Sequence, residues 1–274
     1  MSAATPPYPK VAFLGTPEVA ASTLAALHAA GVPIPLVVSG ADRRRGRGGA
    51  TSPSPVKAAA LEMGLAVTDE PDDVVDSGAE LGVVVAYGRL IRSHLLATMP
   101  FVNLHFSLLP RWRGAAPVER AILAGDERTG VCLMEVTEGL DEGGVYARAE
   151  TEVGGKSAEE LRAELVELGN GLLLDALAHG LGSPTPQVGE ATYARKLSVE
   201  DRRIDWASPA AQQLRVVRIG GAWTTFRGAR IKVLDAHVED GRLIPSTVQP
   251  EGKGPMAYEA WRNGAQPRPD ERFE

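Results

Sequence analysis

The sequence predicts an α/β fold in which a doubly wound parallel sheet is followed by a smaller β domain. Three observations lead to this prediction. Short apolar runs alternate with helical segments over roughly the first two-thirds of the chain. The length of 274 residues allows one large domain and a smaller one. Beyond a turn-rich stretch near residue 182, the pattern changes to short strands separated by glycines.

The first strand is expected at Lys10–Gly15. Thr16 suits the N-cap of the following helix and Pro17 its first turn, so we expect that helix to run to about Ala30. Continuously apolar strands that alternate with helices are typical of a parallel sheet buried on both faces. Further strands are expected at Ile34–Ser39, Leu81–Ala86, Phe101–His105, Val131–Val136 and Val145–Glu150, with a long helix over about Ser157–His179.

A domain boundary is expected where the turn-rich run Gly180–Pro186 ends the long helix. Residues 1–185 would form the α/β domain, 186–206 a linker and 207–274 the smaller β domain. The last stretch, with prolines among charged residues, is predicted to be a frayed tail. Inside the smaller domain we expect a helix at Pro209–Arg218 and antiparallel strands at Ala222–Phe226, Ala229–Val238 and Leu243–Val248.

Composition restricts the class of protein. No apolar run approaches the roughly 18 residues that a membrane-spanning helix requires. The N-terminal residues lack the basic and apolar segments of a secretion signal, so the cytoplasm is the expected location. Cys132 is the single cysteine, which excludes an internal disulfide and a thiolate metal cluster within one chain. We expect no metal.

Charge is unevenly distributed along the chain. The formal net charge of −6 argues by itself against a nucleic-acid partner, because phosphate backbones favour basic surfaces. Between residues 42 and 57, however, five basic residues accompany one acid. Such a cluster is either a solvated basic loop or a phosphate-binding surface. Its basic members are Arg43, Arg44, Arg45, Arg47 and Lys57.

Two polar residues lie at the end of a predicted strand, where open parallel sheets place their ligands. Asn103 and His105 are two positions apart, so their side chains share one face while Leu104 points to the other. An amide can donate to a developing oxyanion, and an imidazole can do the same or carry a proton near neutral pH. Together they supply what acyl transfer requires, although a lone histidine at a strand end is often structural.

Two other segments add polar groups. The loop Ser107–Pro117 holds two arginines and a tryptophan between Pro110 and Gly114. A tryptophan exposed to solvent without a binding role is uncommon, so this loop is a candidate for ligand contact. Asp141 lies in a glycine-dense turn, where the backbone can approach a ligand closely. A carboxylate beside His105 would orient the imidazole ring, whereas the other acids of the turn could serve only to solvate a loop.

Asn103, His105, the sequence SLLP at Ser107–Pro110 and Asp141 resemble the catalytic set and folate signature of the 10-formyltetrahydrofolate-dependent formyltransferases. Five further segments are similar to those of the methionyl-tRNA formyltransferases, in one order over about the first 210 residues. They are TPE after FLG, SPVK, VVAYG, RWRGAAP, and ATYARK followed by IDW. The implied fold is a Rossmann-like formyltransferase domain with an OB-like β-barrel, shortened because only about 70 residues follow Trp206.

The resemblance implies a monomeric enzyme that moves a formyl group from 10-formyltetrahydrofolate to the α-amino group of initiator methionyl-tRNA. Asn103 and His105 would polarise the formyl oxygen, and Asp141 would assist proton transfer. Residues 43–47, together with Lys57, would contact the tRNA acceptor stem. The folate donor would lie against Tyr87, Gly88, Arg89, Leu90, Ile91, Ser107, Leu108, Leu109, Pro110, Gly139 and Leu140.

Other functions remain open on the sequence. An N-formyltransferase of nucleotide-linked amino sugars would share the Asn-His-Asp set but needs no arginine-rich loop. A nicotinamide dehydrogenase is disfavoured because Gly15–Glu18 lacks the G-x-G-x-x-G fingerprint and no acid ends the second strand. A tRNA-binding module without activity would not require Asn103, His105 and Asp141 together. Phe106, where the family has a small residue, either narrows the site or faces the core.

Overall fold

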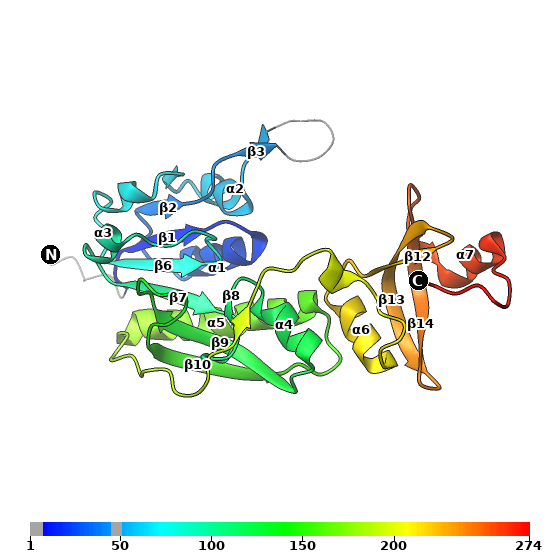
Figure 1. Ribbon diagram of the computed structural model, residues 1–274. Coiled ribbons are helices and arrows are strands. Elements are labelled where there is room, and N and C mark those ends of the chain that lie inside the picture. Colours follow the sequence, from blue (N-terminus) through cyan, green and yellow to red (C-terminus); the bar gives the residue numbers. More distant parts are fainter. Residues whose placement is uncertain (1–7, 45–50) are drawn as a thin grey trace, which may run out of the picture. The chain divides into compact units, whose positions relative to one another are not determined.

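The computed structural model describes residues 8–44 and 51–274. The chain divides into two compact units (Figure 1). The first comprises residues 1–115, 129–151 and 162–194, and the second comprises residues 116–128, 152–161 and 195–274. Among the described residues, no helix combines the length and the apolarity that crossing a membrane requires.

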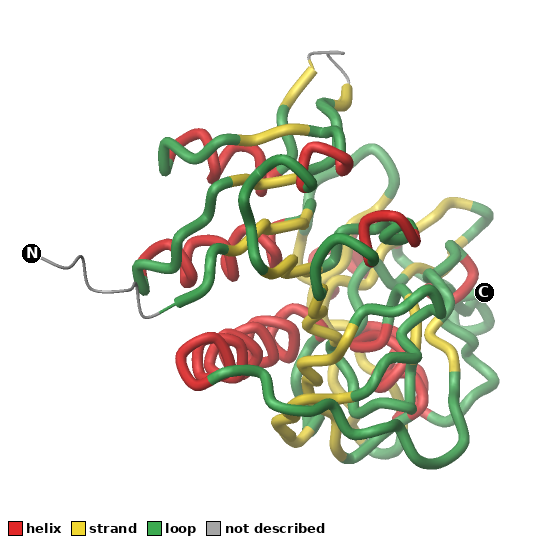
Figure 2. Tube along the Cα trace, turned by 90° about the vertical axis from the view of Figure 1, so that its left-hand side faces the viewer, coloured by secondary structure: helices red, strands yellow, loops and turns green. Residues whose placement is uncertain are grey.

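Seven described strands form the sheet of the first unit, and Figure 2 traces them in yellow. In chain order they are β1 (Val11–Gly15), β2 (Leu36–Val38), β5 (Val67–Thr68), β6 (Leu81–Val85), β7 (Phe101–His105), β9 (Arg128–Glu135) and β10 (Val145–Glu152). Their order across the sheet is β10-β9-β7-β6-β1-β2-β5. The five strands from β5 to β7 are parallel, and β9 runs antiparallel to β7. The predicted parallel sheet is confirmed, with an antiparallel edge added.

Helices cover both faces of this sheet: α1 (Glu18–Ala29), α2 (Pro55–Glu62), the 3₁₀ helix η1 (Pro71–Val74), α3 (Ser93–Leu96) and α5 (Ala158–His179). Ala12 and Leu14 of β1 pack in one core cluster with Leu95 of α3. The alternate residues of β1 face α1, where a side chain at Gly15 would lie 2.7 Å from Ala20. Two helical layers on one sheet define a doubly wound fold.

Strand order reverses at β1, which pairs with β2 on one side and β6 on the other. The carboxyl ends of the strands at such a switch point are the usual ligand site of an open α/β sheet. Here the Thr16 hydroxyl donates to the Tyr87 carbonyl oxygen at 3.2 Å. The prediction that Thr16 caps α1 is therefore wrong: Pro17 holds the N-cap position, and the Thr16 hydroxyl joins the loops after β1 and β6 instead.

The second unit contains a small antiparallel sheet and several helices: α4 (Pro117–Ala124), the 3₁₀ helix η2 (Glu200–Arg202), α6 (Ala210–Arg218), β12 (Trp223–Phe226), β13 (Ala229–Glu239), β14 (Arg242–Pro250), β15 (Met256–Ala257) and α7 (Tyr258–Ala265). Its strands pair in chain order, each antiparallel to the next. The predicted C-terminal β domain is confirmed, and in the described chain β12 and β15 are the edges of its sheet.

The prediction of a frayed tail is wrong. The ring of Phe273 stacks on Trp206 and Trp261, with centroids 5.2 and 5.4 Å apart. Thr225 and Glu274 exchange two backbone hydrogen bonds of 2.9 Å, which tie the end of the chain to the edge strand β12. Prolines and charges suggested an unstructured end, but one aromatic side chain packed against other rings holds the segment in place.

Candidate active site

Asn103 and His105 lie on β7, one pleat apart on the same side of the sheet. Leu104 faces the other side, as predicted, since a side chain at Gly169 of α5 would lie 3.3 Å from a Leu104 methyl carbon. Asn103 is half-buried, and its amide has no hydrogen-bond partner among the described residues. That amide is therefore available to a ligand.

Both ring nitrogens of His105 face an acceptor. Nδ1 lies 3.5 Å from Oδ2 of Asp141, and Nε2 lies 2.8 Å from the carbonyl oxygen of Trp112. The imidazole is 5% exposed. The structure thus brings His105 and Asp141 together, as the sequence predicts, and adds a backbone contact from the loop after β7 that the sequence did not indicate.

Asp141 is held by its backbone as much as by its side chain. Its φ of +52° lies in the left-handed region, which aspartate tolerates better than most residues. Oδ2 also accepts a hydrogen bond of 2.7 Å from the backbone N–H of Gly114. Two residues later, a side chain at Gly143 would lie 2.0 Å from the Glu135 carbonyl oxygen. The glycine-dense turn therefore has a steric reason, because only glycine lets it fold back on β9.

The residues that follow β7 are held in place by buried contacts of Ser107 and Leu109. The buried Ser107 hydroxyl donates to the Arg111 carbonyl oxygen at 2.6 Å. Leu109 lies in a core cluster with the buried Cys132. Phe106 is 8% exposed and faces the core, which decides between the two alternatives left by the sequence. Ser107 and Leu109, both predicted to contact folate, thus lie inside the loop, while Leu108 and Pro110 are partly exposed.

The loop after β6 borders a pocket of about 360 Å³ in the first unit. Three residues predicted to contact folate line it, namely Tyr87, Arg89 and Leu90. The Tyr87 hydroxyl is buried and has no hydrogen-bond partner among the described residues, and burial raises the pKa of Tyr87. Leu90 is 71% exposed, whereas Ile91 packs into the core. The pocket is also lined by Arg92 and by the acidic residues Glu70 and Asp72, so it combines apolar side chains with charges of both signs.

Of the other three residues predicted at the folate site, Leu140 is 49% exposed and Gly139 precedes it in the turn that holds Asp141. Gly88 has a φ of +78°, so the loop after β6 turns sharply beside Tyr87. The loop after β6 and the turn that holds Asp141 therefore each present an exposed leucine, Leu90 and Leu140 respectively. Exposed leucines suit a planar apolar ring better than they suit water.

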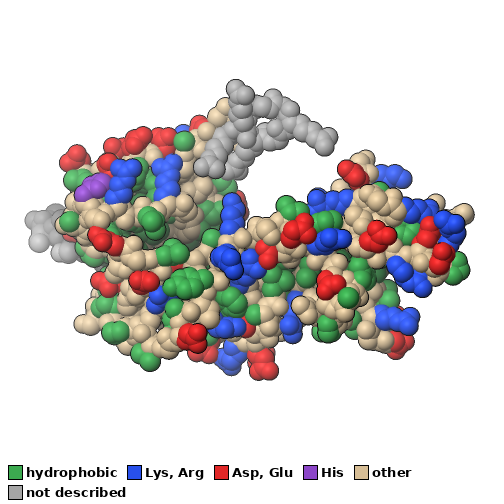
Figure 3. All heavy atoms as spheres, in the orientation of Figure 1, with side chains coloured by type: hydrophobic (Ala, Val, Ile, Leu, Met, Phe, Trp, Pro, Cys, Tyr) green, Lys and Arg blue, Asp and Glu red, His purple; other side chains and the backbone are tan. Residues whose placement is uncertain are grey.

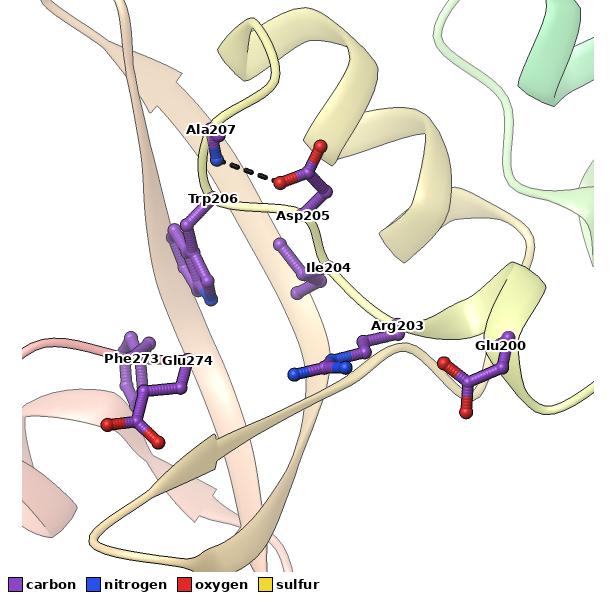
Figure 4. A pocket seen from close by; sticks show the side chains of 8 residues that line it. All are labelled: Glu200, Arg203, Ile204, Asp205, Trp206, Ala207, Phe273 and Glu274. Atoms are coloured by element: carbon purple, nitrogen blue, oxygen red, sulfur yellow. Dashed lines mark hydrogen bonds between the residues drawn. The ribbon is translucent and has the colours of Figure 1, made fainter.

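A larger pocket of about 510 Å³ lies in the second unit (Figure 4). Trp206 and Phe273 form its apolar side, and Arg203 reaches toward it from the segment before Ile204. Asp205 is engaged locally, since its Oδ1 accepts from the Ala207 N–H at 3.0 Å. None of the residues predicted to be catalytic or to bind folate lines this pocket. Among the described residues, no cluster of three or more His, Cys, Asp or Glu could hold a metal ion.

The basic stretch starts as a hairpin, in which β3 (Arg43–Arg44) pairs antiparallel with β4 (Thr51–Ser52). Arg45 and Arg47 lie outside the described residues. Lys57, in the first turn of α2, places its Nζ 2.7 Å from Asp42 at the base of the hairpin. On the strands of the second unit, the face drawn in Figure 3 mixes basic and acidic side chains.

The site residues that sequence reasoning missed lie in the expected linker. Thr192 accepts a hydrogen bond of 2.9 Å from the Trp112 N–H through its hydroxyl oxygen, and Gln187 contacts the turn that carries Asp141. β11 (Tyr193–Ala194) pairs in parallel with β8 (Arg113–Gly114), next to the residues that contact His105 and Asp141. Only the similarity of residues 191–196 to a family motif pointed toward this region.

A protein-family model described as "Formyl transferase" matches residues 9–177, and one described as "Formyl transferase, C-terminal domain" matches residues 196–244. The methionyl-tRNA formyltransferase of Symbiobacterium thermophilum is 38% identical over 309 residues, which cover 96% of this chain and 95% of that protein. The solved structure of methionyl-tRNA formyltransferase from Clostridium thermocellum aligns with a TM-score of 0.66 at 15% identity, covering 89% of this chain and 99% of that one. HypX from Aquifex aeolicus in complex with tetrahydrofolic acid aligns with a TM-score of 0.67 at 17% identity, covering 93% and 47%.

Proposed function

Since this chain belongs to the formyl transferase family, we propose that it transfers the formyl group of 10-formyltetrahydrofolate to the α-amino group of methionyl-initiator tRNA. The relative from Symbiobacterium thermophilum, which bears the name of that activity, is matched along nearly its whole length. The structural observation that carries the proposal is the grouping at the end of β7, where the Asn103 amide, which has no partner in the described part of the chain, shares a face of the sheet with the His105–Asp141 pair.

In this reaction the amine nitrogen bonds to the formyl carbon, the bond from that carbon to N10 of the folate breaks, and the amine's proton ends on N10. Negative charge develops on the formyl oxygen while the carbon is tetrahedral. The Asn103 amide would donate a hydrogen bond to that oxygen. Preorganised donors of this kind are usually the largest single contribution to catalysis of acyl transfer.

His105 would be the second donor. In the structure its Nε2 faces the Trp112 carbonyl oxygen at 2.8 Å. That carbonyl and a formyl oxygen are both acceptors, so His105 would exchange one for the other while its Nδ1 remains beside Asp141.

Asp141 would keep the His105 ring oriented and accept charge as the proton leaves the amine. Its carboxylate is 15% exposed, so its interaction with the imidazole is weakly screened by solvent. The Gly114 N–H shares the same carboxylate oxygen, which fixes that oxygen independently of the histidine.

The residues of the first unit fit a folate donor. Tyr87 lines a pocket together with Arg89 and Leu90, and its buried hydroxyl has no hydrogen-bond partner among the described residues. Arg89 would attract the negatively charged end of a folate. Leu90 and Leu140 would lie against the ring system, and Ser107–Pro110 would contribute through the shape of their loop.

The initiator tRNA would be met by the basic stretch of residues 43–57, which carries four arginines and Lys57 on an acidic chain and in which β3 pairs with β4. Neutralised phosphates release counterions, so a few arginines can supply much of a nonspecific affinity for RNA. We further propose that the enzyme acts as a monomer in the cytoplasm, where charged initiator tRNA is found.

The deciding experiment offers the purified protein 10-formyltetrahydrofolate with either methionyl-initiator tRNA or a nucleotide-linked amino sugar. Formylation of the tRNA alone is the expected result. Formylation of the sugar alone would overturn the proposal in favour of the sugar N-formyltransferases, which share the catalytic residues but not the basic hairpin. Binding of tRNA without turnover on either acceptor would indicate a module without activity.

A further inference from the structure

Gln187 connects the two loops that contact His105. Its Nε2 donates to the carbonyl oxygens of Asp141 and Gly143, each at 2.8 Å. Its Oε1 accepts from Nε and Nη2 of Arg113, at 3.1 and 2.8 Å. One amide thus joins the turn that carries Asp141 to the residue between Trp112 and Gly114.

Arg113 reinforces this connection. Its side chain is 13% exposed, and its Nη1 reaches Oε1 of Glu142 in the same turn at 3.2 Å. Its neighbours Trp112 and Gly114 supply the carbonyl that faces His105 and the N–H that holds the Asp141 carboxylate. Movement of Arg113 therefore displaces groups on both sides of the imidazole.

We propose that Gln187 is a positioning residue for formyl transfer, which holds the Asp141 turn and the Arg113 segment in register so that Asp141 and Trp112 bracket His105. Gln187 contacts neither His105 nor the Asp141 carboxylate, so it acts through them. Because this role concerns the same reaction, the inference rests on the proposed function.

The energetics favour a positional role. Asp141 sits in the left-handed region, and its carboxylate lies 3.5 Å from the imidazole, at the long end of the interaction range. Without the amide, two partly buried carbonyl oxygens lose their partner while Arg113 keeps its contact with Glu142, and unsatisfied carbonyls of this kind are costly. The turn would relax, and a small displacement of Asp141 would break its contact with Nδ1.

The segment itself does not depend on Gln187. Thr185 exchanges backbone hydrogen bonds with Val145, at 2.8 and 2.9 Å. The Arg113 N–H donates to the Thr192 carbonyl oxygen and the Ala115 N–H to the Ala194 carbonyl oxygen, both at 2.8 Å. Replacing the Gln187 side chain therefore leaves the path of residues 185–194 intact.

The test begins with Gln187→Met, which keeps the length of the side chain and removes all four hydrogen bonds. We expect kcat to fall on the order of 10-fold, with KM for tRNA and folate changed less than about twofold, as for an interaction that acts mainly in the transition state. In an Asp141→Asn background the same substitution should lower kcat by less than about twofold, because both changes act through the same contact between Asp141 and His105. An unchanged kcat, or an equal loss in both backgrounds, would overturn the proposal.

A second variant separates the two halves of the contact. Gln187→Glu keeps the acceptor for Arg113 as an ion pair and loses both donors to the turn. If Gln187 positions Asp141, this variant should be as slow as Gln187→Met. A wild-type kcat in Gln187→Glu would show that the two hydrogen bonds to the Asp141 turn are not needed, which would overturn the proposal. Val188→Ala, at the adjacent and 86% exposed position, is the matched control and should behave as wild type.

A readout without turnover keeps this inference distinguishable from the proposed function. The imidazole nitrogens of the five histidines can be followed by NMR, with His105→Ala identifying the signal of His105. Gln187→Met should shift that signal and leave the other four in place, whereas Val188→Ala should shift none. If the His105 signal of Gln187→Met is the same as in the wild type, the positioning role of Gln187 is wrong even if the wild type formylates tRNA. If the signal shifts but the wild type formylates no acceptor, only the proposed function is wrong.

Discussion

Oδ2 of Asp141 lies 3.5 Å from Nδ1 of His105 and, on its other side, accepts a hydrogen bond of 2.7 Å from the Gly114 N–H. The carboxylate is thus anchored by backbone that follows β7, although Asp141 itself lies between β9 and β10. The shorter of the two contacts is the one to the backbone. The carboxylate therefore stays in place whether or not the imidazole moves toward a ligand.

His105→Ala should lower kcat by a factor on the order of 10² or more, since it removes a proton-transfer group and an oxyanion donor together. Folate binding should persist, because the pocket of Tyr87, Arg89 and Leu90 does not include His105. Steady-state formylation and equilibrium binding of folate measure the two quantities. Turnover equal to wild type would remove His105 from the mechanism.

Asp141→Asn should lower kcat by at least about 10-fold while leaving the fold intact. The amide oxygen can still accept from the Gly114 N–H, so the backbone anchor survives. The negative charge beside Nδ1 of His105 is lost. Circular dichroism checks the fold and single-turnover formylation checks the chemistry. An unaffected rate would mean that Asp141 acts only through the shape of the turn.

Local patterns were sufficient for some parts of the site and insufficient for others. β7 was predicted to the residue, because an isolated apolar run with polar positions two apart has one interpretation as a strand. Asp141 could be assigned only by resemblance, since no pattern reveals which loop meets the end of β7. Gln187 was missed because its amide bonds to backbone carbonyls, and such partners depend on where two distant loops pass each other.

The prediction of a frayed C-terminal tail was wrong for a different reason. Charges and prolines favour solvent, and Phe273 is a single aromatic residue among them. Its stacking partners Trp206 and Trp261 come from segments before and after the sheet, so its environment exists only once the second unit has folded. The switch-point contact between Thr16 and Tyr87 is similar, because the helix-cap pattern gives no sign of a partner 71 residues away.

Phe273→Ala should destabilise the second unit by about 2 kcal/mol, less than the 3–5 typical of a fully buried phenylalanine because this ring is partly exposed. Urea unfolding followed by tryptophan fluorescence reports the change, since two of the four tryptophans contact this ring. Val238→Ala, at a 42% exposed position on β13, is the control. Equal midpoints for the two variants would show that the tail adds nothing to stability.

Asp201→Asn should reduce stability at neutral pH by about 1 kcal/mol, a value near the upper end for an accessible ion pair. Hydrogen bonds from Arg120, at 2.7 and 3.1 Å, and from the Ser198 N–H hold the pKa of the Asp201 carboxyl well below its usual range. A carboxyl whose pKa is lowered by folding stabilises the protein fully above the unfolded value of about 3.9. That contribution is lost as the pH falls through the folded value.

The difference in unfolding free energy between wild type and Asp201→Asn should therefore be constant from pH 7 to pH 5 and shrink below about pH 4. Urea titrations at pH 7, 5 and 3 measure it. Asp235→Asn, on the exposed side of β13, should show little difference at any pH. A difference between wild type and Asp201→Asn that grows on acidification would contradict the assignment.

Replacing Arg43, Arg44 and Arg45 together by Ala should weaken tRNA binding and make it less dependent on salt. Each phosphate neutralised contributes a slope of roughly −0.7 to −0.9 in a plot of log K against log salt concentration, so losing three contacts should flatten the line by about 2 to 3. Binding isotherms between 50 and 200 mM salt give the slope. At saturating tRNA, kcat should stay within about twofold of wild type, because residues 43–45 do not take part in the His105–Asp141 contact.

Lys57→Ala is the informative comparison. Its ammonium is already paired with Asp42, so it should change the slope by less than one contact. A triple variant with the wild-type slope would mean that tRNA phosphates are met elsewhere on this acidic chain.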